Sequence, residues 1–247
     1  MQSQKRHRKE VMRMTKKITI KGDIVDNITG KFYQYFSLPY ASPEIVENVL
    51  NGGDVNDDVE LHVASNGGDV FAASEIYTML RNYKGNVTVN VEGLAASAAS
   101  VVTMAGDKVR MSPTAQLMIH KAWSQPAGNS DDLEHEAQVL NGIDESIAMA
   151  YEAKTGMQQS DLLNLMAKET WLTAKDAVDK GFADEIMFVD ETQPQAVNSI
   201  SEIPSKQALN KFMTLLSKTN KESESQPKVK EKEPSLLDQK LAILLQK

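Results

Sequence analysis

Ser97 has the clearest potential for chemistry in this chain. It follows residues 86–91, in which three valines alternate with polar residues as in a half-buried strand. The residues around it, 93–100, are small and suited to a helix. A serine at such a strand-to-helix junction can be approached by another backbone and has helix N-terminal amides beside it. Ser97 is therefore a candidate nucleophile, although small residues also occur at such junctions for tight packing and the GxSxG motif is absent.

Hydrolysis by a serine also needs a base, and His120 is the candidate. It ends the apolar run 117–119, and α/β folds place active sites where the ends of strands meet. The alternative is a histidine that caps an element or fills the core. His62 lies within a predicted strand and is expected to be structural, whereas His135 lies on an acidic helix and is expected to be solvated.

Backbone N–H groups that would stabilise the oxyanion of such a reaction also have candidates. Gly67 and Gly68 lie between a predicted strand and a predicted helix, so the chain can turn sharply there and direct amides into a cleft. Ala98 would supply a second N–H at the start of the helix after Ser97. Two glycines also suit an ordinary turn, and the phosphate-loop and dinucleotide motifs are absent. Ser100, one turn further along, should lie deeper and is the weaker nucleophile candidate.

Strands and helices that would position these residues alternate from about residue 15 to residue 190. Apolar and polar patterning predicts strands at 17–21, 59–63, 87–91, 109–111, 116–119 and 185–189. Helical spacing and capping residues predict helices from Ser42-Pro43, over 69–83, 96–104, 131–155 and 159–166, and from Thr173 to a stop at Gly181. This order is typical of an α/β fold with a mostly parallel sheet.

Composition narrows the class of protein. The 27 basic and 34 acidic side chains give a net charge of −7, which argues against general nucleic-acid binding. Cysteine is absent, which excludes disulfides and thiol nucleophiles and fits a reducing cytoplasm. The four histidines form no HxxxH or HExxH pair, so no metal site is expected. No apolar run is long enough to cross a bilayer, so no membrane partner is expected either.

Three parts are predicted along the chain. Residues 1–14 form a basic arm that is expected to be disordered, and residues 15–190 form the α/β domain. Residues 191–247 form a C-terminal extension, in which the charged linker 218–234 separates two short amphipathic segments. We expect these segments to form helices that bind a partner or another copy of the chain, with packing on the main domain as the alternative.

Several motifs agree in order and spacing with one protein family. They are SNGGDV at 65–70, GLAASA at 93–98, LMIH at 117–120 and WLTAKDAVDKGFAD at 171–184. Over residues 18–188 the chain resembles the Clp protease proteolytic subunit family, peptidase S14. The resemblance implies a crotonase/Clp protease-like fold with repeated β-β-α units and a protruding handle helix, which matches 131–154. It also implies a serine endopeptidase that works without a cofactor and assembles into a homo-oligomeric ring.

The resemblance assigns roles to five residues. The nucleophile of the family falls on Ser97, its base on His120, and its oxyanion amides on Gly68 and Ala98. The third member of its catalytic triad, an aspartate two residues before an aromatic, falls on Glu169.

Two positions depart from the family pattern. The triad acid is Glu169, and its extra methylene changes the reach to the histidine, so Asp161 and Asp176 stay as alternatives. Asn66 stands where the family usually has proline, which makes the turn less rigid but should spare the amide of Gly68. The segment 123–130 is expected to run beside the peptide-binding groove.

The C-terminal extension bears on the biological role. The housekeeping subunit of the family ends soon after its last strand, whereas this chain continues through 191–247. That architecture resembles the Clp-like prohead proteases of phages and prophages, which cleave scaffold or capsid precursors in head maturation. The first alternative is a general cytoplasmic, ATP-dependent Clp subunit that works with an AAA+ unfoldase. The others are a crotonase-like acyl-CoA enzyme, which needs no serine–histidine pair, and an inactive assembly scaffold.

Overall fold

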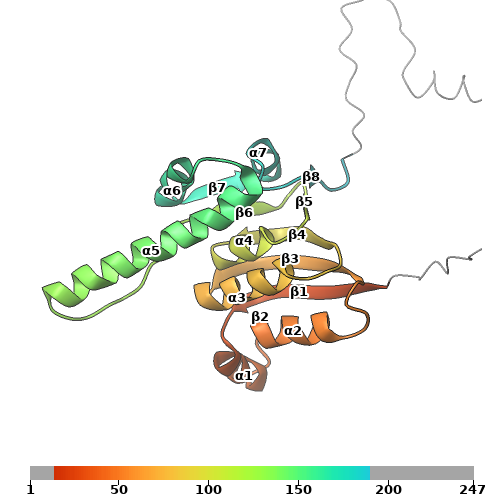
Figure 1. Ribbon diagram of the computed structural model, residues 1–247, viewed down its shortest axis with the longest axis horizontal. Coiled ribbons are helices and arrows are strands. Elements are labelled where there is room, and N and C mark those ends of the chain that lie inside the picture. Colours follow the sequence, from red (N-terminus) through yellow and green to blue (C-terminus); the bar gives the residue numbers. More distant parts are fainter. Residues whose placement is uncertain (1–13, 190–247) are drawn as a thin grey trace, which may run out of the picture. The chain divides into compact units, whose positions relative to one another are not determined.

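The computed structural model of the protein describes residues 14–189. The predicted basic arm, apart from Met14, and the predicted extension with its linker and helices lie outside the described residues. The described part is built on one sheet with helices (Figure 1), so the predicted α/β fold with a mostly parallel sheet is confirmed.

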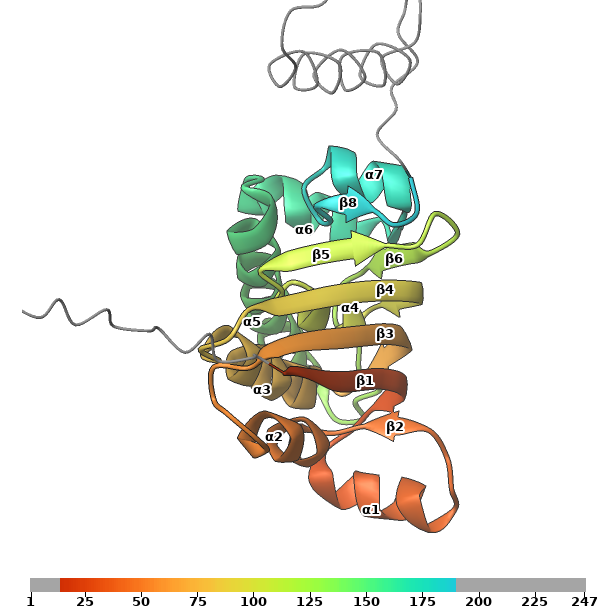
Figure 2. The same ribbon diagram turned by 90° about the vertical axis from the view of Figure 1, so that its right-hand side faces the viewer.

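The sheet has eight strands. Their bounds are β1 Thr15–Ile24, β2 Tyr40–Ala41, β3 Asp58–Gly68, β4 Val87–Ala96, β5 Lys108–Met111, β6 Gln116–Ile119, β7 Thr170–Thr173 and β8 Glu185–Ile186. The main path runs β2-β1-β3-β4-β5-β8 with parallel neighbours (Figure 2). The first part of β4 pairs with β5 and its end pairs with β6, while β7 runs antiparallel to β6.

Helices cover one face of this sheet, and one helix projects beyond it. The bounds are α1 Asn27–Tyr35, α2 Pro43–Asn51, α3 Val70–Arg81, α4 Ala98–Thr103, α5 Ser130–Thr155, α6 Gln159–Ala167 and α7 Ala174–Asp179. In Figure 2, α3 and α4 lie behind the strands. The N-terminal part of α5 extends away from the sheet (Figure 1), as the expected handle helix would. A capping box at Asn129 begins α5, and Gly156, with a φ of 70°, ends it.

The core lies between the sheet and the helices. Alternate residues of the central strands point into it, and Ile20, Leu61 and Val89 are each 0% exposed. The residues between them, such as His62, point to the other face of the sheet. No helix within residues 14–189 is both long and apolar enough to cross a membrane.

Several predicted boundaries need correction. The strand predicted at 185–189 is wrong beyond Ile186, because β8 pairs with β5 at only two positions before the chain turns. The helix predicted from residue 96 begins at Ala98, because Ala96 still pairs with Met118 in the sheet. Ser42 precedes α2 as predicted, but its side chain makes no capping bond. The sequence pattern does not predict α1, β2 or β7.

Candidate active site

The backbone at Ser97 turns sharply between β4 and α4. Its φ is 54°, a value that residues other than glycine rarely adopt. Its N–H donates to the carbonyl of Met118 at 2.9 Å, which fastens the end of β4 to β6. Such strained conformations persist where the surroundings enforce them and cluster at functional sites. The turn presents the Ser97 side chain at the sheet edge where β6 also ends.

The loop after β3 lies directly against this turn. Gly67 has a φ of 98°, and a Cβ atom there would come within 2.7 Å of both the Ser97 Cβ and the Ala96 carbonyl oxygen. Only glycine leaves room for this approach. Ser65 steadies the loop, because its hydroxyl donates to the Gly22 carbonyl at 2.6 Å and accepts from the Gly67 N–H at 3.0 Å.

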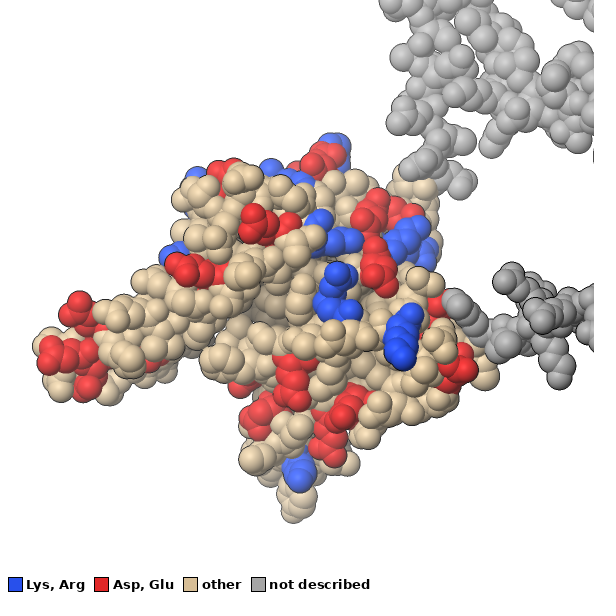
Figure 3. All heavy atoms as spheres, viewed as in Figure 1, with Lys and Arg blue, Asp and Glu red and all other residues tan. Residues whose placement is uncertain are grey.

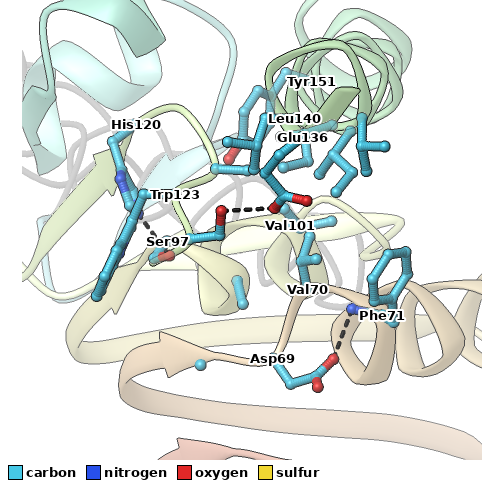
Figure 4. Close-up of a pocket in the computed structure, with 17 residues that line it drawn as sticks. Asp69, Val70, Phe71, Ser97, Val101, His120, Trp123, Glu136, Leu140 and Tyr151 are labelled. Atoms are coloured by element: carbon cyan, nitrogen blue, oxygen red, sulfur yellow. Dashed lines mark hydrogen bonds between the residues drawn. The ribbon is translucent and has the colours of Figure 1, made fainter. Parts of the chain in front are cut away.

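His120 follows β6 and reaches the same point. Its Nε2 lies 2.7 Å from the Ser97 Oγ, a hydrogen-bond distance (Figure 4). Pairing of Ala96 with Met118 sets this separation, since it aligns the last residues of β4 and β6. Both side chains are partly exposed, so a substrate can reach them. A serine hydroxyl in contact with an imidazole nitrogen is the arrangement that nucleophilic catalysis requires.

Two amides flank this pair at the same edge. Ala98 is the first residue of α4, so its N–H has no acceptor within the helix. Gly68 has a φ of 147°, and a Cβ there would come within 2.2 Å of the Ile24 carbonyl oxygen. Both residues line a cavity with Ser97 and His120. The Ala98 amide is thus available to an oxyanion, and glycine at position 68 lets the backbone pass close to β1 at the same edge.

Ser100 differs from Ser97 in its surroundings. It is 0% exposed, and its hydroxyl donates to the Ser97 carbonyl at 2.6 Å. The same oxygen lies 2.8 Å from the hydroxyl of Tyr151 on α5. Burial raises the pKa of Tyr151, so this phenol stays protonated and joins α5 to α4. Ser100 thus lies deeper, as the helical spacing predicts.

Glu169 is brought beside His120 by the pairing of β6 with β7. Ile119 pairs with Thr170 in the antiparallel ladder, so the residues just beyond them, His120 and Glu169, are neighbours along the backbone. The Glu169 carboxylate accepts a bond from the Trp171 indole N–H at 3.2 Å. Within residues 14–189 no hydrogen bond joins Glu169 to His120. The side chain is exposed, and its φ is 48°.

The other candidate acids lie in different settings. The Asp176 carboxylate caps α7 through the Thr173 N–H and hydroxyl, at 3.2 and 2.6 Å, and these bonds lower the pKa of Asp176. Asp161 lies exposed in the first turn of α6.

The remaining histidines match their expected settings. His62 Nδ1 lies 2.7 Å from the Glu92 Oε1, and this contact lowers the pKa of Glu92. The pair lies on the sheet face opposite α3 and α4. His135 is exposed on α5.

A cavity of about 360 Å³ opens beside the serine–histidine pair. Its lining includes Val101 from α4, Leu140 and Tyr151 from α5, and Trp123, as Figure 4 shows. Trp123 is 70% exposed. The segment expected to border a peptide groove thus begins at this cavity.

Asp144 is a residue of this site that the sequence reasoning missed. It is 3% exposed, accepts the Ala122 N–H at 2.8 Å, and lies 3.4 Å from the Lys121 ammonium. It therefore fastens the two residues after His120 to α5. A signal was present, because Asp144 interrupts an apolar helical stripe that includes Leu140, Ile147 and Tyr151.

This geometry suits acyl transfer through a serine. Within residues 14–189, no group of three or more His, Cys, Asp or Glu side chains is placed to hold a metal ion. An α/β fold that carries such a serine–histidine pair is typical of a serine hydrolase. The family model described as Clp protease matches residues 42–190, and the chain belongs to this family of serine-type endopeptidases.

Curated relatives with similar sequences share one description. An ATP-dependent Clp protease proteolytic subunit of Deinococcus radiodurans is 29% identical over 147 residues, covering 59% of this chain and 71% of the relative. That of Bacteroides fragilis is 27% identical, with 56% and 68% covered. Subunit 2 of Tropheryma whipplei is 24% identical, with 56% and 78% covered.

Proposed function

We propose that this chain cleaves protein substrates with Ser97 as nucleophile, His120 as base and Glu169 as the acid that orients the base. The observation that carries the proposal is the 2.7 Å contact between Ser97 Oγ and His120 Nε2 beside an open cavity. Membership of the Clp protease family supports it independently.

The proposed reaction follows from these positions. Neutral His120 accepts the Ser97 proton on Nε2 while Oγ attacks the peptide carbonyl carbon. The carbonyl oxygen becomes an anion and accepts bonds from the Gly68 and Ala98 N–H groups. The imidazolium returns its proton to the leaving amine, and water then hydrolyses the acyl-serine by the same steps. Glu169 accepts a hydrogen bond from the Nδ1–H of His120 after its side chain turns away from Trp171, and its carboxylate stays ionised.

A serine-directed reagent tests the proposed nucleophile. A fluorophosphonate should label the full chain at Ser97, as read by mass spectrometry of the digested protein. The neighbouring Ser100 is an internal control, because it is buried and hydrogen-bonded. Labelling of Ser100, or of no serine, would contradict the proposal.

We also propose that the chain works as a homo-oligomeric ring in the cytoplasm. α5 supports this, because its outer part projects from the sheet while carrying Leu133, which is 45% exposed (Figure 1). A neighbouring copy would cover such side chains. Light scattering of the purified chain should give a closed assembly, and an active particle near 27.3 kDa would overturn this part.

For the biological role we propose processing of scaffold or capsid precursors in phage head maturation. The supporting feature is the sequence of 191–247, with its charged linker and amphipathic segments. Removing 191–247 should leave cleavage of a short peptide nearly unchanged and weaken processing of a capsid precursor. Equal loss of both activities would contradict a role in partner choice.

A general ATP-dependent Clp subunit is the second candidate, because the similar relatives carry that description. Its partner would be an AAA+ unfoldase. The two roles differ in one measurement: degradation of a stably folded protein, with ATP and a bacterial Clp unfoldase present. Such degradation by the full chain would favour the general role, and its absence together with cleavage of a capsid precursor would favour the phage role.

A further inference from the structure

Glu136 is a charged side chain that the proposed reaction does not use. It lies in the second turn of α5 and lines the cavity that also contains Ser97 and His120 (Figure 4). Its Oε1 accepts a bond from the Ser124 hydroxyl at 2.6 Å, which steadies the carboxylate on the cavity wall.

The charges around the cavity are acidic. Its lining includes two carboxylates, Asp69 and Glu136, and contains no lysine or arginine. Asp69 is occupied, because its Oδ1 accepts the N–H groups of Phe71 and Ala72 at 2.8 Å each as the cap of α3. The nearby Lys121 pairs with Asp144 at 3.4 Å. Among the described residues, Glu136 thus contacts no cation.

The remaining walls are apolar and complete a site for a long side chain. They are formed by Val101, Val139, Leu140, Ile143 and Ile147. A volume of about 360 Å³ exceeds what a short aliphatic side chain fills. Methylene groups of lysine or arginine would pack on such walls while the cationic end reaches a carboxylate. A neutral side chain would leave the Glu136 carboxylate with the Ser124 hydroxyl and no cation beside it in a site closed by substrate.

We infer that Glu136 makes this cavity select lysine or arginine at the residue whose carbonyl Ser97 attacks. Ser97 and Ala98 line this cavity, so a substrate whose carbonyl contacts them has the adjoining side chain beside the cavity. This inference rests on the proposed function. Glu136 is then a determinant of specificity and takes no part in bond breaking.

Paired peptides test the inference. One set carries lysine at the cleaved residue and the other carries Nε-acetyl-lysine, which keeps the four methylene groups, removes the charge and adds an acetyl group. The full chain should show a kcat/KM ratio of roughly tenfold or more in favour of lysine, as a charge-assisted bond supplies. In Glu136→Gln the ratio should fall to about twofold or less.

Glu134→Gln is the matched control. It removes the same charge two residues away on α5, where the side chain is exposed and does not line the cavity. The lysine preference should persist in this variant. Thermal melting of both variants checks that each is folded.

Four outcomes would overturn the inference. An equal ratio in the native chain and Glu136→Gln would remove Glu136 as the determinant, and a lost preference in Glu134→Gln would assign the effect to overall charge. A native preference for acetyl-lysine would contradict cation selection itself. If the native chain cleaves no peptide and a fluorophosphonate labels no serine, the proposed function fails, and this inference fails with it.

Discussion

Ser97 and Glu169 both have a positive φ, 54° and 48°, yet they stand in opposite surroundings. The residues beside Ser97, Ala96 and Ala98, are 2% and 4% exposed. Glu169 is exposed, and the indole that holds its carboxylate, Trp171, is 51% exposed. One turn is enclosed by packing and the other is held by a strand ladder and one surface hydrogen bond.

Because of this difference, the Ser97 turn and the Glu169 carboxylate differ in how far they can move. The position of Ser97 follows from close backbone contacts, and these cannot change without moving the core. The carboxylate of Glu169 can change partner by rotating its side chain at little cost in packing. The nucleophile side is thus preformed, and the acid side is open to adjustment when substrate or another copy of the chain binds.

The largest expected loss of activity comes from a change at Ser97, in the enclosed turn. Ser97→Ala removes the nucleophile and little volume, so peptide cleavage should fall by about 10⁴–10⁶-fold while the melting temperature stays nearly unchanged. Turnover of a fluorogenic peptide provides the measurement. Full activity in this variant would show that another group is the nucleophile.

A smaller loss of activity is expected from a change at Glu169, whose side chain is exposed. Glu169→Gln removes the charge that orients His120, so kcat should fall by about 10²–10⁴-fold with little change in KM. Asp161→Asn and Asp176→Asn are the controls, and both should keep most of the activity. If either control is inactive while Glu169→Gln is active, Glu169 is the wrong acid. Trp171→Phe sharpens the test, because it frees the Glu169 carboxylate and should not lower the rate.

Replacing a glycine by alanine tests the packing of the turn at Ser97. Gly67→Ala places a Cβ against Ser97 and Ala96 at a φ of 98°, so we expect the free energy of unfolding to drop by about 1–3 kcal/mol, together with loss of cleavage. Gly142→Ala on α5 is the contrast. Apart from the backbone of its own helix and its chain neighbours, no atom lies within 4 Å of its Cβ position, so the alanine should stabilise the helix by about 0.5–1 kcal/mol. Chemical denaturation measures both free energies of unfolding. Equal changes in the two variants would contradict the difference in packing.

The smallest expected loss of stability concerns the hydrogen bond between α4 and α5. Tyr151→Phe removes the hydroxyl that bonds to Ser100 and keeps the buried ring. Ser100 retains its bond to the Ser97 carbonyl, so the free energy of unfolding should fall by only about 1 kcal/mol. A loss several times larger would show that this hydrogen bond, and not the packed ring, holds α5 in place.

Much of the local structure could be predicted from the sequence. The alternating valines before Ser97 predict β4, and Thr173 and Gly181 mark the bounds of α7, where a capping box and a φ of 82° are found. The motifs around Ser97 and His120 indicate a serine peptidase. These signals are local, because strand alternation, capping and glycine turns depend on residues only a few positions apart.

Tertiary structure alone decided the rest. Four-residue β7 has no strong pattern of its own, and only its pairing with β6 places Glu169 beside His120. The partner of the Glu169 carboxylate, the anchoring bond of Asp144 and the place of Glu136 in the cavity all depend on which distant segments meet. Sequence determined which residues can do chemistry and which elements carry them. Long-range packing decided which of those residues touch, because such contacts join segments that no local pattern relates.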